Sequence, residues 1–312
     1  SVRMSRPRSS DQQTETETLP LKDVLVHVDN SRNGEARLEY AAQLATAHDA
    51  HLSGLYVSSP AANADGGGGR SAGLPSLDFG GRSFQEYEKK ASEMQALHKE
   101  HASLAADAAR QKFTERVATG GVTNEWSAVE GTMMDALTHN ARFCDVAVVG
   151  QPGAGSARRF GETVSDHLIL SVGHPVLVVP ALDEGFSVGK RIMIAWDRSP
   201  LATRAIHNSR PFMRNADSVH VLAINLALET HDGKPGSGII DHLARHGIEA
   251  TGLHVDDTSS SVADIILDQA KKLDIDLIIM GAYGQSRLRE RILGGNTYQL
   301  LNNSPVPMLM SH

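Results

Sequence analysis

Residues 275–284 read IDLIIMGAYG, and two more glycines, Gly294 and Gly295, follow after nine intervening residues. A short apolar run that ends on glycine predicts a buried strand followed by a tight turn. Glycine lets the backbone approach a ligand closely and adopt a positive φ. The amides at the start of a helix after Gly295 would offer unpaired donors and a positive dipole end. This order of strand, glycine turn, loop and helix is typical of a phosphate-binding site.

The chain also repeats itself. Residues 22–31 (KDVLVHVDNS) match residues 190–199 (KRIMIAWDRS), and in each an apolar run ends in Asp with Ser two positions later. Residues 144–153 (CDVAVVGQPG) match 275–284 in the same way, and the closing runs after Pro175 and Pro307 also agree. These matches indicate two copies of one α/β unit that meet near residues 181–189.

Short Val/Ile/Leu runs alternate with helical patterns in each copy, which favours βαβ units and a parallel sheet. The nearly continuous apolar runs at 146–149 and 277–280 fit strands that are buried on both faces. Strands are expected at residues 23–29, 51–57, 124–129, 145–150, 175–179, 191–197, 218–225, 248–255, 276–281 and 307–310. Helices are expected at residues 34–48, 84–117, 131–142, 162–172, 201–214, 237–246, 261–273 and 295–303.

The glycines Gly281, Gly284 and Gly294 have the spacing Gly-x2-Gly-x9-Gly. This pattern resembles the nucleotide loop of the universal stress protein family, in which Ser or Thr follows the last glycine. Here Gly295 follows instead, and Thr297 comes two residues later. Since the pattern lies between an apolar strand and a helix, the resemblance is more specific than three glycines alone.

The resemblance covers nearly all of residues 22–312 and implies an α/β fold class. Two tandem five-stranded parallel-sheet, Rossmann-like domains would pack as a pseudo-dimer through their last strands. Residues 21–182 would form the N-terminal domain and residues 188–312 the C-terminal one, which suits a length of 312 residues. The polar residues 1–20 are expected to be a disordered tail rather than a secretory signal.

The resemblance further implies that the C-terminal copy binds an adenine nucleotide: ATP, or else AMP or ADP, with Mg²⁺. Asp197 and the backbone near Ile224 would hold the nucleoside, although Asp197 could instead cap the next helix. Arg287 suits phosphate through its planar guanidinium, but it could equally pair with Glu290 or line a subunit contact. The residues expected around the phosphates are Gly281, Gly284, Arg287, Gly294, Gly295, Asn296 and Thr297.

The N-terminal copy carries a weaker version of this site, with Asp29, Gly150 and Gly153 as the equivalent residues. Its next glycine arrives after seven residues instead of nine, and Glu162 follows it directly. A carboxylate beside a phosphate site repels anions. We therefore expect this copy to bind nucleotide poorly or not at all and to have a structural or regulatory role.

The N-terminal copy also contains an insertion, mostly between Ser58 and Ala118. Its Gly-rich part, residues 61–81, is expected to be a mobile loop. Residues 83–116 predict a long helix that either covers the first sheet edge or acts as a lid or partner-binding helix. The residues expected on one face of this helix are Phe84, Tyr87, Ala91, Met94, Leu97 and His98.

Composition excludes several functions. A net charge of −7 argues against nucleic-acid binding, and apolar runs shorter than ~18 residues argue against a membrane helix. The single cysteine, Cys144, begins a buried strand and predicts an inert thiol in a reducing compartment, so a cytoplasmic location is expected. The fifteen histidines include the close pairs His48/His51, His98/His101 and His242/His246. These lack a zinc-site pattern and are expected to lie on solvated helix faces.

No Gly-x-Ser-x-Gly elbow or Walker loop is present, so no catalytic residue is expected. The chain is expected to be a regulatory nucleotide-binding protein with an unknown protein partner, and it could form a homodimer. One alternative is an interaction scaffold without a nucleotide. Another is an enzyme of the same superfold that hydrolyses ATP slowly.

Overall fold

The structure is a computed structural model, and it describes residues 20–59, 84–152, 163–182, 186–226, 236–283 and 295–312. The expected tail at residues 1–20, apart from Pro20, and the expected loop at 61–81 lie outside this part of the chain. The side chains of Phe84, Tyr87 and Ala91 also lie outside it.

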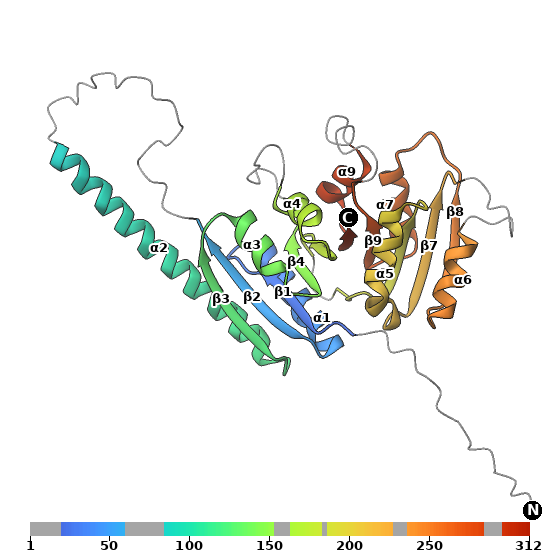
Figure 1. Cartoon of the computed structure of the whole chain (residues 1–312), viewed down its shortest axis with the longest axis horizontal. Coiled ribbons are helices and arrows are strands. Elements are labelled where there is room, and N and C mark those ends of the chain that lie inside the picture. Colours follow the sequence, from blue (N-terminus) through green and yellow to red (C-terminus); the bar gives the residue numbers. More distant parts are fainter. Residues whose placement is uncertain (1–19, 60–83, 153–162, 183–185, 227–235, 284–294) are drawn as a thin grey trace, which may run out of the picture.

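Ten strands form one continuous sheet in the order β3-β2-β1-β4-β5-β10-β9-β6-β7-β8 (Figure 1). The strands of the N-terminal copy are β1 (Asp23–His27), β2 (His51–Ser58), β3 (Asn124–Glu130), β4 (Val146–Gly150) and β5 (Val176–Val179). Those of the C-terminal copy are β6 (Arg191–Trp196), β7 (Ser218–Ile224), β8 (Thr251–Val255), β9 (Leu277–Gly281) and β10 (Met308–Ser311). The strands are parallel within each copy, which confirms the predicted fold class.

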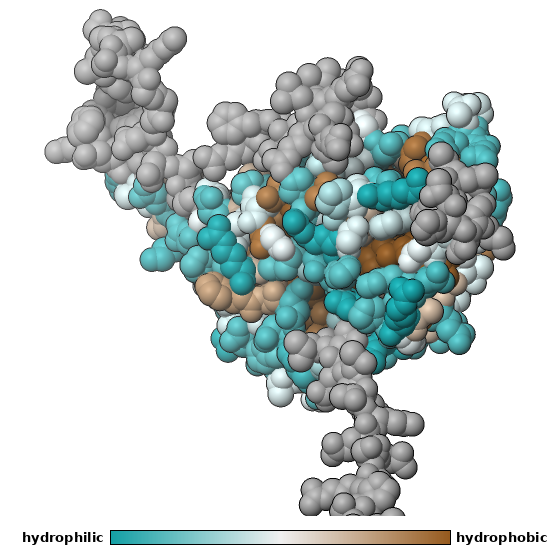
Figure 2. All heavy atoms as spheres, turned by 45° about the vertical axis from the view of Figure 1, so that its right-hand side comes forward, coloured by the Kyte–Doolittle hydropathy of each residue, from teal (hydrophilic) through white to brown (hydrophobic). Residues whose placement is uncertain are grey.

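Helices cover both faces of the sheet, and two apolar cores lie between them and the strands. Alternate strand residues enter opposite cores: Val24 and Val26 enter one, and Leu25 enters the other. The first core packs against α1 (Arg32–His48), α2 (Phe84–Ala118), α5 (Pro200–Arg214) and α6 (Ser237–Arg245). The second packs against α3 (Met133–Ala141), α4 (Val164–Ser171), α7 (Val262–Lys272) and α9 (Asn296–Asn303). On the face seen in Figure 2, apolar residues gather only in small patches between hydrophilic ones.

The two copies join through their last strands, as predicted for a pseudo-dimer. β5 and β10 pair antiparallel, with Leu177 opposite Leu309 at the centre. Two hydrogen bonds reinforce this junction from outside the sheet. The Gln151 side chain donates to the Ser304 carbonyl at 3.0 Å, and the Tyr283 hydroxyl donates to the Asp166 carboxylate. Since one sheet runs through both copies, the division at residues 182 and 188 stays a prediction.

Helix α2 covers the sheet with only part of its length. Ala109, Phe113 and Val117 are buried, and Phe113 packs on Trp126 of β3 with ring centroids 5.4 Å apart. Met94 is 70% exposed and Leu97 is 53% exposed, because this part of α2 extends beyond the sheet (Figure 1). Met94, Leu97 and His98, which were expected on one face of the helix, therefore lie outside the part of α2 that covers the sheet. One half of the helix therefore covers the sheet, as the first alternative predicted, while a role of the other half as a lid or partner-binding helix stays a prediction.

The predicted elements all occur, with small shifts at their ends. The largest concerns β8, which was expected from residue 248 but begins at Thr251. The Ile248 amide donates to the Leu243 carbonyl, so Ile248 still belongs to the end of α6. Gly247 allows this reversal with a φ of 72°. Among the described helices none is long and apolar enough to cross a membrane.

Candidate functional site: a pocket at the carboxyl ends of β6, β7 and β9

A pocket of about 240 Å³ opens where three strands of the C-terminal copy end. β6 lies between β9 and β7, so the strand order reverses beside β6. Ligands of doubly wound sheets bind outside the carboxyl ends of the strands at such a point. The pocket is lined by Ala195, Trp196, Asp197, Leu222, Ile224, Val262, Ile266, Met280, Gly281, Tyr283, Asn296 and Thr297.

Five of the residues predicted for this site come together here: Asp197, Ile224, Gly281, Asn296 and Thr297. They arrive from the ends of three strands and from the first turn of α9. Gly284, Arg287 and Gly294 lie outside the described residues, so their place in the site stays a prediction.

Asp197 lines the pocket without capping the next helix. Ser199 caps α5, because its hydroxyl accepts a hydrogen bond from the Ala202 amide at 3.0 Å. The Asp197 carboxylate accepts one from the Ser199 amide at 2.9 Å, which fixes the turn before the helix. The capping alternative for Asp197 is therefore wrong, and the exposed carboxylate is placed at the mouth of the pocket.

Gly281 lines the pocket, but its lack of a side chain serves packing. A Cβ at this position would lie 2.6 Å from the Ala202 amide nitrogen and 2.6 Å from the Leu201 carbonyl carbon. The end of β9 therefore meets the first turn of α5 at a distance that only glycine allows. This requirement is independent of any ligand, and the glycine motif alone did not indicate it.

The walls of the pocket are mostly apolar, and most of these residues were missed in the sequence. They come from strand ends and from the buried face of α7, where their pattern is that of ordinary core residues. Trp196 Nε1 is buried and has no hydrogen-bond partner among the residues described. The apolar wall residues that the sequence did not indicate include Leu222, Val262, Ile266 and Met280. A flat, largely apolar group with a few polar atoms would fit this lining.

The open end of the pocket meets the N-terminus of α9. Gly295 precedes the helix and provides no side-chain cap, so the first amides of α9 lack the partner that Ser or Thr would give. Asn296 Oδ1 accepts a hydrogen bond from the Ala263 amide at 3.3 Å, which ties α9 to α7. Thr297 Oγ1 accepts a long one, 3.5 Å, from the Tyr283 amide. These contacts leave an anion-attracting helix end beside the pocket.

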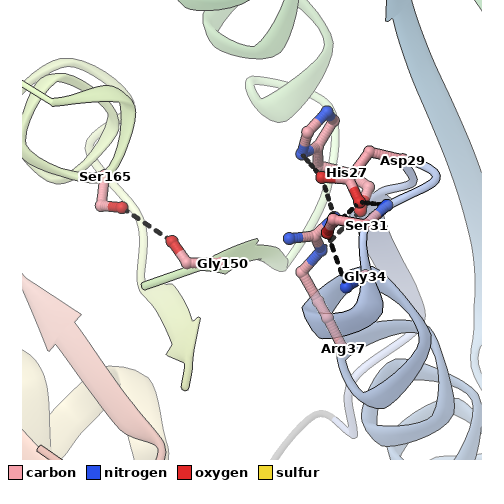
Figure 3. A network of polar contacts seen from close by, with 7 residues as sticks. All are labelled: His27, Asp29, Ser31, Gly34, Arg37, Gly150 and Ser165. Atoms are coloured by element: carbon pink, nitrogen blue, oxygen red, sulfur yellow. Dashed lines mark hydrogen bonds and ion pairs between the residues drawn. The ribbon is translucent and has the colours of Figure 1, made fainter. Parts of the chain in front are cut away.

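At the ends of β1 and β4, the N-terminal copy has an ion pair between the buried Arg37 and the partly exposed Asp29 (Figure 3). Arg37 of α1 is only 3% exposed, and its Nη2 lies 3.0 Å from Asp29 Oδ2. Its Nε donates to the His27 carbonyl at 2.6 Å. The predicted residues Asp29 and Gly150 thus lie near one another, but a guanidinium occupies the space between them. Gly153 lies outside the described residues.

This cluster changes the protonation of its members. Burial, followed by the charge of Arg37, lowers the pKa of His27 to about 3, so this imidazole is neutral. Burial raises the pKa of Asp29, but Arg37 and the hydrogen bonds from Ser31 outweigh this effect and bring that pKa to about 2. The Asp29 carboxylate is therefore charged at neutral pH.

Other candidate groups have no comparable arrangement. Among the described residues no three His, Cys, Asp or Glu side chains are placed to hold a metal. The rings of His242 and His246 meet edge-on with centroids 4.7 Å apart, and His207 stacks on His242 at 5.4 Å. Both His242 and His246 are half-buried, so the expected solvation of this pair is only partial. Burial is the main cause that raises the pKa of Cys144 to about 12, consistent with an inert thiol.

Comparisons with known proteins agree on one family. The universal stress protein family model matches the chain twice, over residues 20–180 and 189–312. Universal stress protein Slr1230 of Synechocystis sp. is 22% identical over 306 residues, which cover 93% of this chain and 99% of that protein.

Solved structures show the same fold. A universal stress protein from Archaeoglobus fulgidus DSM 4304 has a TM-score of 0.62 at 16% identity, covering 92% of this chain and 97% of its own. A putative universal stress protein from Pseudomonas aeruginosa UCBPP-PA14 has a TM-score of 0.55 at 13% identity, covering 93% of both chains. At these identities the likeness concerns the fold alone.

Proposed function

Because the chain belongs to the universal stress protein family, we propose that it binds an adenine nucleotide, ATP in the first place, in its C-terminal copy. Membership of the family makes it a stress-response protein. The nucleotide would regulate that response by changing the surface that a protein partner recognises. A cytoplasmic location remains a prediction from the cysteine content.

The observation that carries this proposal is the meeting of Asp197, Ile224, Gly281, Asn296 and Thr297 around one pocket. These residues come from four separate segments of the sequence. A chance agreement would scatter them over the domain, whereas all five line the same space at the switch point of the sheet.

The size and lining of the pocket assign the parts of the ligand. Its volume of about 240 Å³ is below the ~300–1,000 Å³ typical of drug-sized ligands, so the described walls suit the nucleoside rather than a whole nucleotide. The apolar walls would contact adenine, and Asp197 would accept hydrogen bonds from ribose hydroxyls or the adenine amino group. The phosphates would lie outside, at the N-terminus of α9. Mg²⁺ would be held mainly by phosphate oxygens, as is usual for this ion.

The test is the thermal stability of nucleotide-stripped protein with and without ATP and Mg²⁺. Ligand at ~100 times its Kd should stabilise the wild type by about 2.7 kcal/mol. Asp197→Ala should lose most of this gain, because the variant lacks the acceptor at the pocket mouth. Asp241→Ala, which removes an exposed carboxylate on α6, should keep it. No shift with ATP, ADP or AMP in the wild type would refute the proposal.

A second candidate, an interaction scaffold, is favoured by one observation. Met94 and Leu97 are exposed on the part of α2 that extends beyond the sheet, and Leu104 is 61% exposed further along the same helix. Exposed apolar residues of this kind are common at protein contacts. A wild type without any nucleotide response would favour the scaffold. Phosphate release above the buffer rate that disappears in Asp197→Ala would instead favour the slow ATP-hydrolysing enzyme.

A further inference from the structure

We propose that the imidazole of His27 occupies, in the N-terminal copy, the space that receives the nucleotide base in the C-terminal copy, and that it thereby excludes adenine nucleotides from the N-terminal copy. The inference rests on the proposed function, since it concerns the counterpart of the pocket around Asp197. It names one side chain in the base-binding part of the site, separate from the glycine loop, as the cause of the weak binding expected of this copy.

Strand register makes His27 the counterpart of Ala195, which lines the pocket. His27 pairs with Leu55 of β2. Ala195 pairs with Leu222 of β7, the equivalent strand of the C-terminal copy. Each of the two residues is followed, two positions later, by the aspartate of its copy. The two side chains therefore start from equivalent points at the carboxyl ends of β1 and β6.

His27 also points to the face of the sheet on which the pocket lies. Side chains two positions apart share one face of a strand, and Leu25, two residues before His27, enters the second core. In the other copy Met193 enters the same core and Ala195 packs against it, as do most residues around the pocket. Figure 3 shows the His27 ring pointing away from the side chain of Arg37, which comes from α1 on the opposite face.

The walls around His27 are apolar, like those of the pocket. Strand register and the N-caps of α3 and α7, Thr132 and Ser261, relate the wall residues of the two copies. The equivalent residues, in the same order, are Leu55, Val57, Leu137 and Val149 in the N-terminal copy and Leu222, Ile224, Ile266 and Met280 in the C-terminal one. An imidazole in place of the methyl group of Ala195 is therefore the change that most reduces the space between these walls.

The imidazole of His27 is enclosed at this position. The residue is only 8% exposed, and its Nε2 is buried without a hydrogen-bond partner among the residues described. Its Nδ1 lies 4.0 Å from Asp29 Oδ2, which is beyond hydrogen-bond distance. Buried polar side chains usually have such partners. The ring therefore fills space here without the hydrogen bonds that normally accompany a buried histidine.

The chemistry of this ring resembles that of the ligand it would replace. An imidazole is the five-membered ring of a purine, and burial keeps the His27 ring neutral by lowering its pKa to about 3. A planar, neutral, nitrogen-containing ring thus belongs to the N-terminal site itself. A base that contacted the end of β1, as it would contact Ala195 at the end of β6, would overlap this ring. The wild-type protein should therefore bind one adenine nucleotide per chain.

The first test places a histidine in the C-terminal pocket and measures ATP–Mg²⁺ binding by titration calorimetry. Ala195→His should weaken binding by about 100-fold or more, because a pocket filled by a side chain rejects the base. Ala195→Ser, which adds only a hydroxyl group, is the matched control and should retain most of the affinity. Circular dichroism checks that both variants fold. If the histidine variant folds and binds ATP like the serine control, the inference is wrong.

The second test opens the N-terminal site and uses adenine alone as the probe, because the glycine loop of this copy is also altered. His27→Ala should raise the number of adenine molecules bound per chain from one to two in equilibrium dialysis. His51→Ala, which removes a histidine at the opposite end of β2 in the same copy, is the matched control and should leave this number at one.

Two results of these measurements would overturn the inference. A folded His27→Ala protein that binds no additional adenine would mean that another group closes the site, and a wild type with two ATP per chain would mean that the site is not closed. Absence of ATP binding by the wild type would instead refute the proposed function. The adenine gained by His27→Ala is measured separately from ATP binding by the wild type, so the two failures are distinguishable.

Discussion

The two copies share the arrangement of their strands and helices, but different side chains lie at the carboxyl ends of their strands. β1 and β6, with the serine caps that follow them, have the same register and the same capping geometry. Beyond these strands, one copy has an ion pair between a buried arginine and a partly exposed aspartate, and the other has a pocket with an exposed carboxylate. A repeat can therefore keep its sheet unchanged while its two copies differ in the side chains placed beyond the same strands.

The largest contrast is expected at the two equivalent glycines. Gly281→Ala should cost about 3 kcal/mol of unfolding free energy, because its Cβ would meet backbone atoms of α5 that cannot move independently. Gly150→Ala should cost less, about 1–2 kcal/mol, since its Cβ meets the end of a side chain, Arg37. Urea unfolding measures both. Equal costs would mean that the two strand ends are packed alike.

The next contrast concerns the two aspartates. Asp29→Ala should lower the stability at pH 7 by about 2 kcal/mol, because Arg37 would stay buried without its counter-ion. Asp197→Ala should cost under about 1 kcal/mol, since only a hydrogen bond in an exposed turn is lost.

The pH dependence of this contrast has a definite sign. The pKa of Asp29 is depressed to about 2 from its ordinary 3.8, so its contribution is complete above pH 4 and disappears as the pH falls towards 2. Wild type and Asp29→Ala should therefore converge in stability in acid. A difference that persists at pH 2 would indicate lost packing instead of a lost ion pair.

A smaller effect per pH unit is expected from His27, whose counterpart Ala195 cannot titrate. The pKa of His27 is lowered to about 3, so below pH 6.5 the unfolded chain takes up a proton that the folded chain does not. Stability should fall with decreasing pH by up to about 1.4 kcal/mol per unit from this residue. His27→Ala should remove this slope in denaturant titrations between pH 6 and 4. An unchanged slope would show that His27 is protonated in the fold.

The smallest effect is expected for the two capping serines, whose removal should destabilise the protein by equal amounts. Ser31→Ala and Ser199→Ala should each cost about 1 kcal/mol, because each removes one cap of the same geometry. Two melting curves suffice. Costs that differ by more than about 1 kcal/mol would contradict the shared framework on which the comparison of the two sites depends.

The fold was accessible from the sequence because its signals are local or repeated. Apolar runs such as 146–149 and 277–280 mark buried strands, and the duplication indicates where each copy begins. The pairing of β5 with β10 came from the family resemblance, since no local pattern encodes it. The sequence did not show that part of α2 extends beyond the sheet, because periodicity cannot distinguish an apolar helix face that is covered from one that is exposed.

The sequence predicted the polar residues that line the candidate pocket, but not the apolar residues that form its walls. Asp197 and Gly281 belong to recognisable motifs, whereas Val262 and Ile266 look like core residues of any helix. The ion pair of Arg37 with Asp29 also has a signal in the sequence. Aligning the copies places Arg37 opposite Ala205, and an arginine on the apolar face of a helix needs a buried partner.

The β5–β10 junction joins two copies that differ in their sites, and the short linker between these copies keeps them in one molecule. Only residues 180–190 separate the last strand of one copy from the first strand of the other. A linker this short holds its ends at an effective concentration in about the millimolar range. Two separate half-length chains could pair like with like, which would give molecules with two open sites or with none. Covalent fusion prevents this exchange, so every molecule carries one copy of each kind however dilute the protein is.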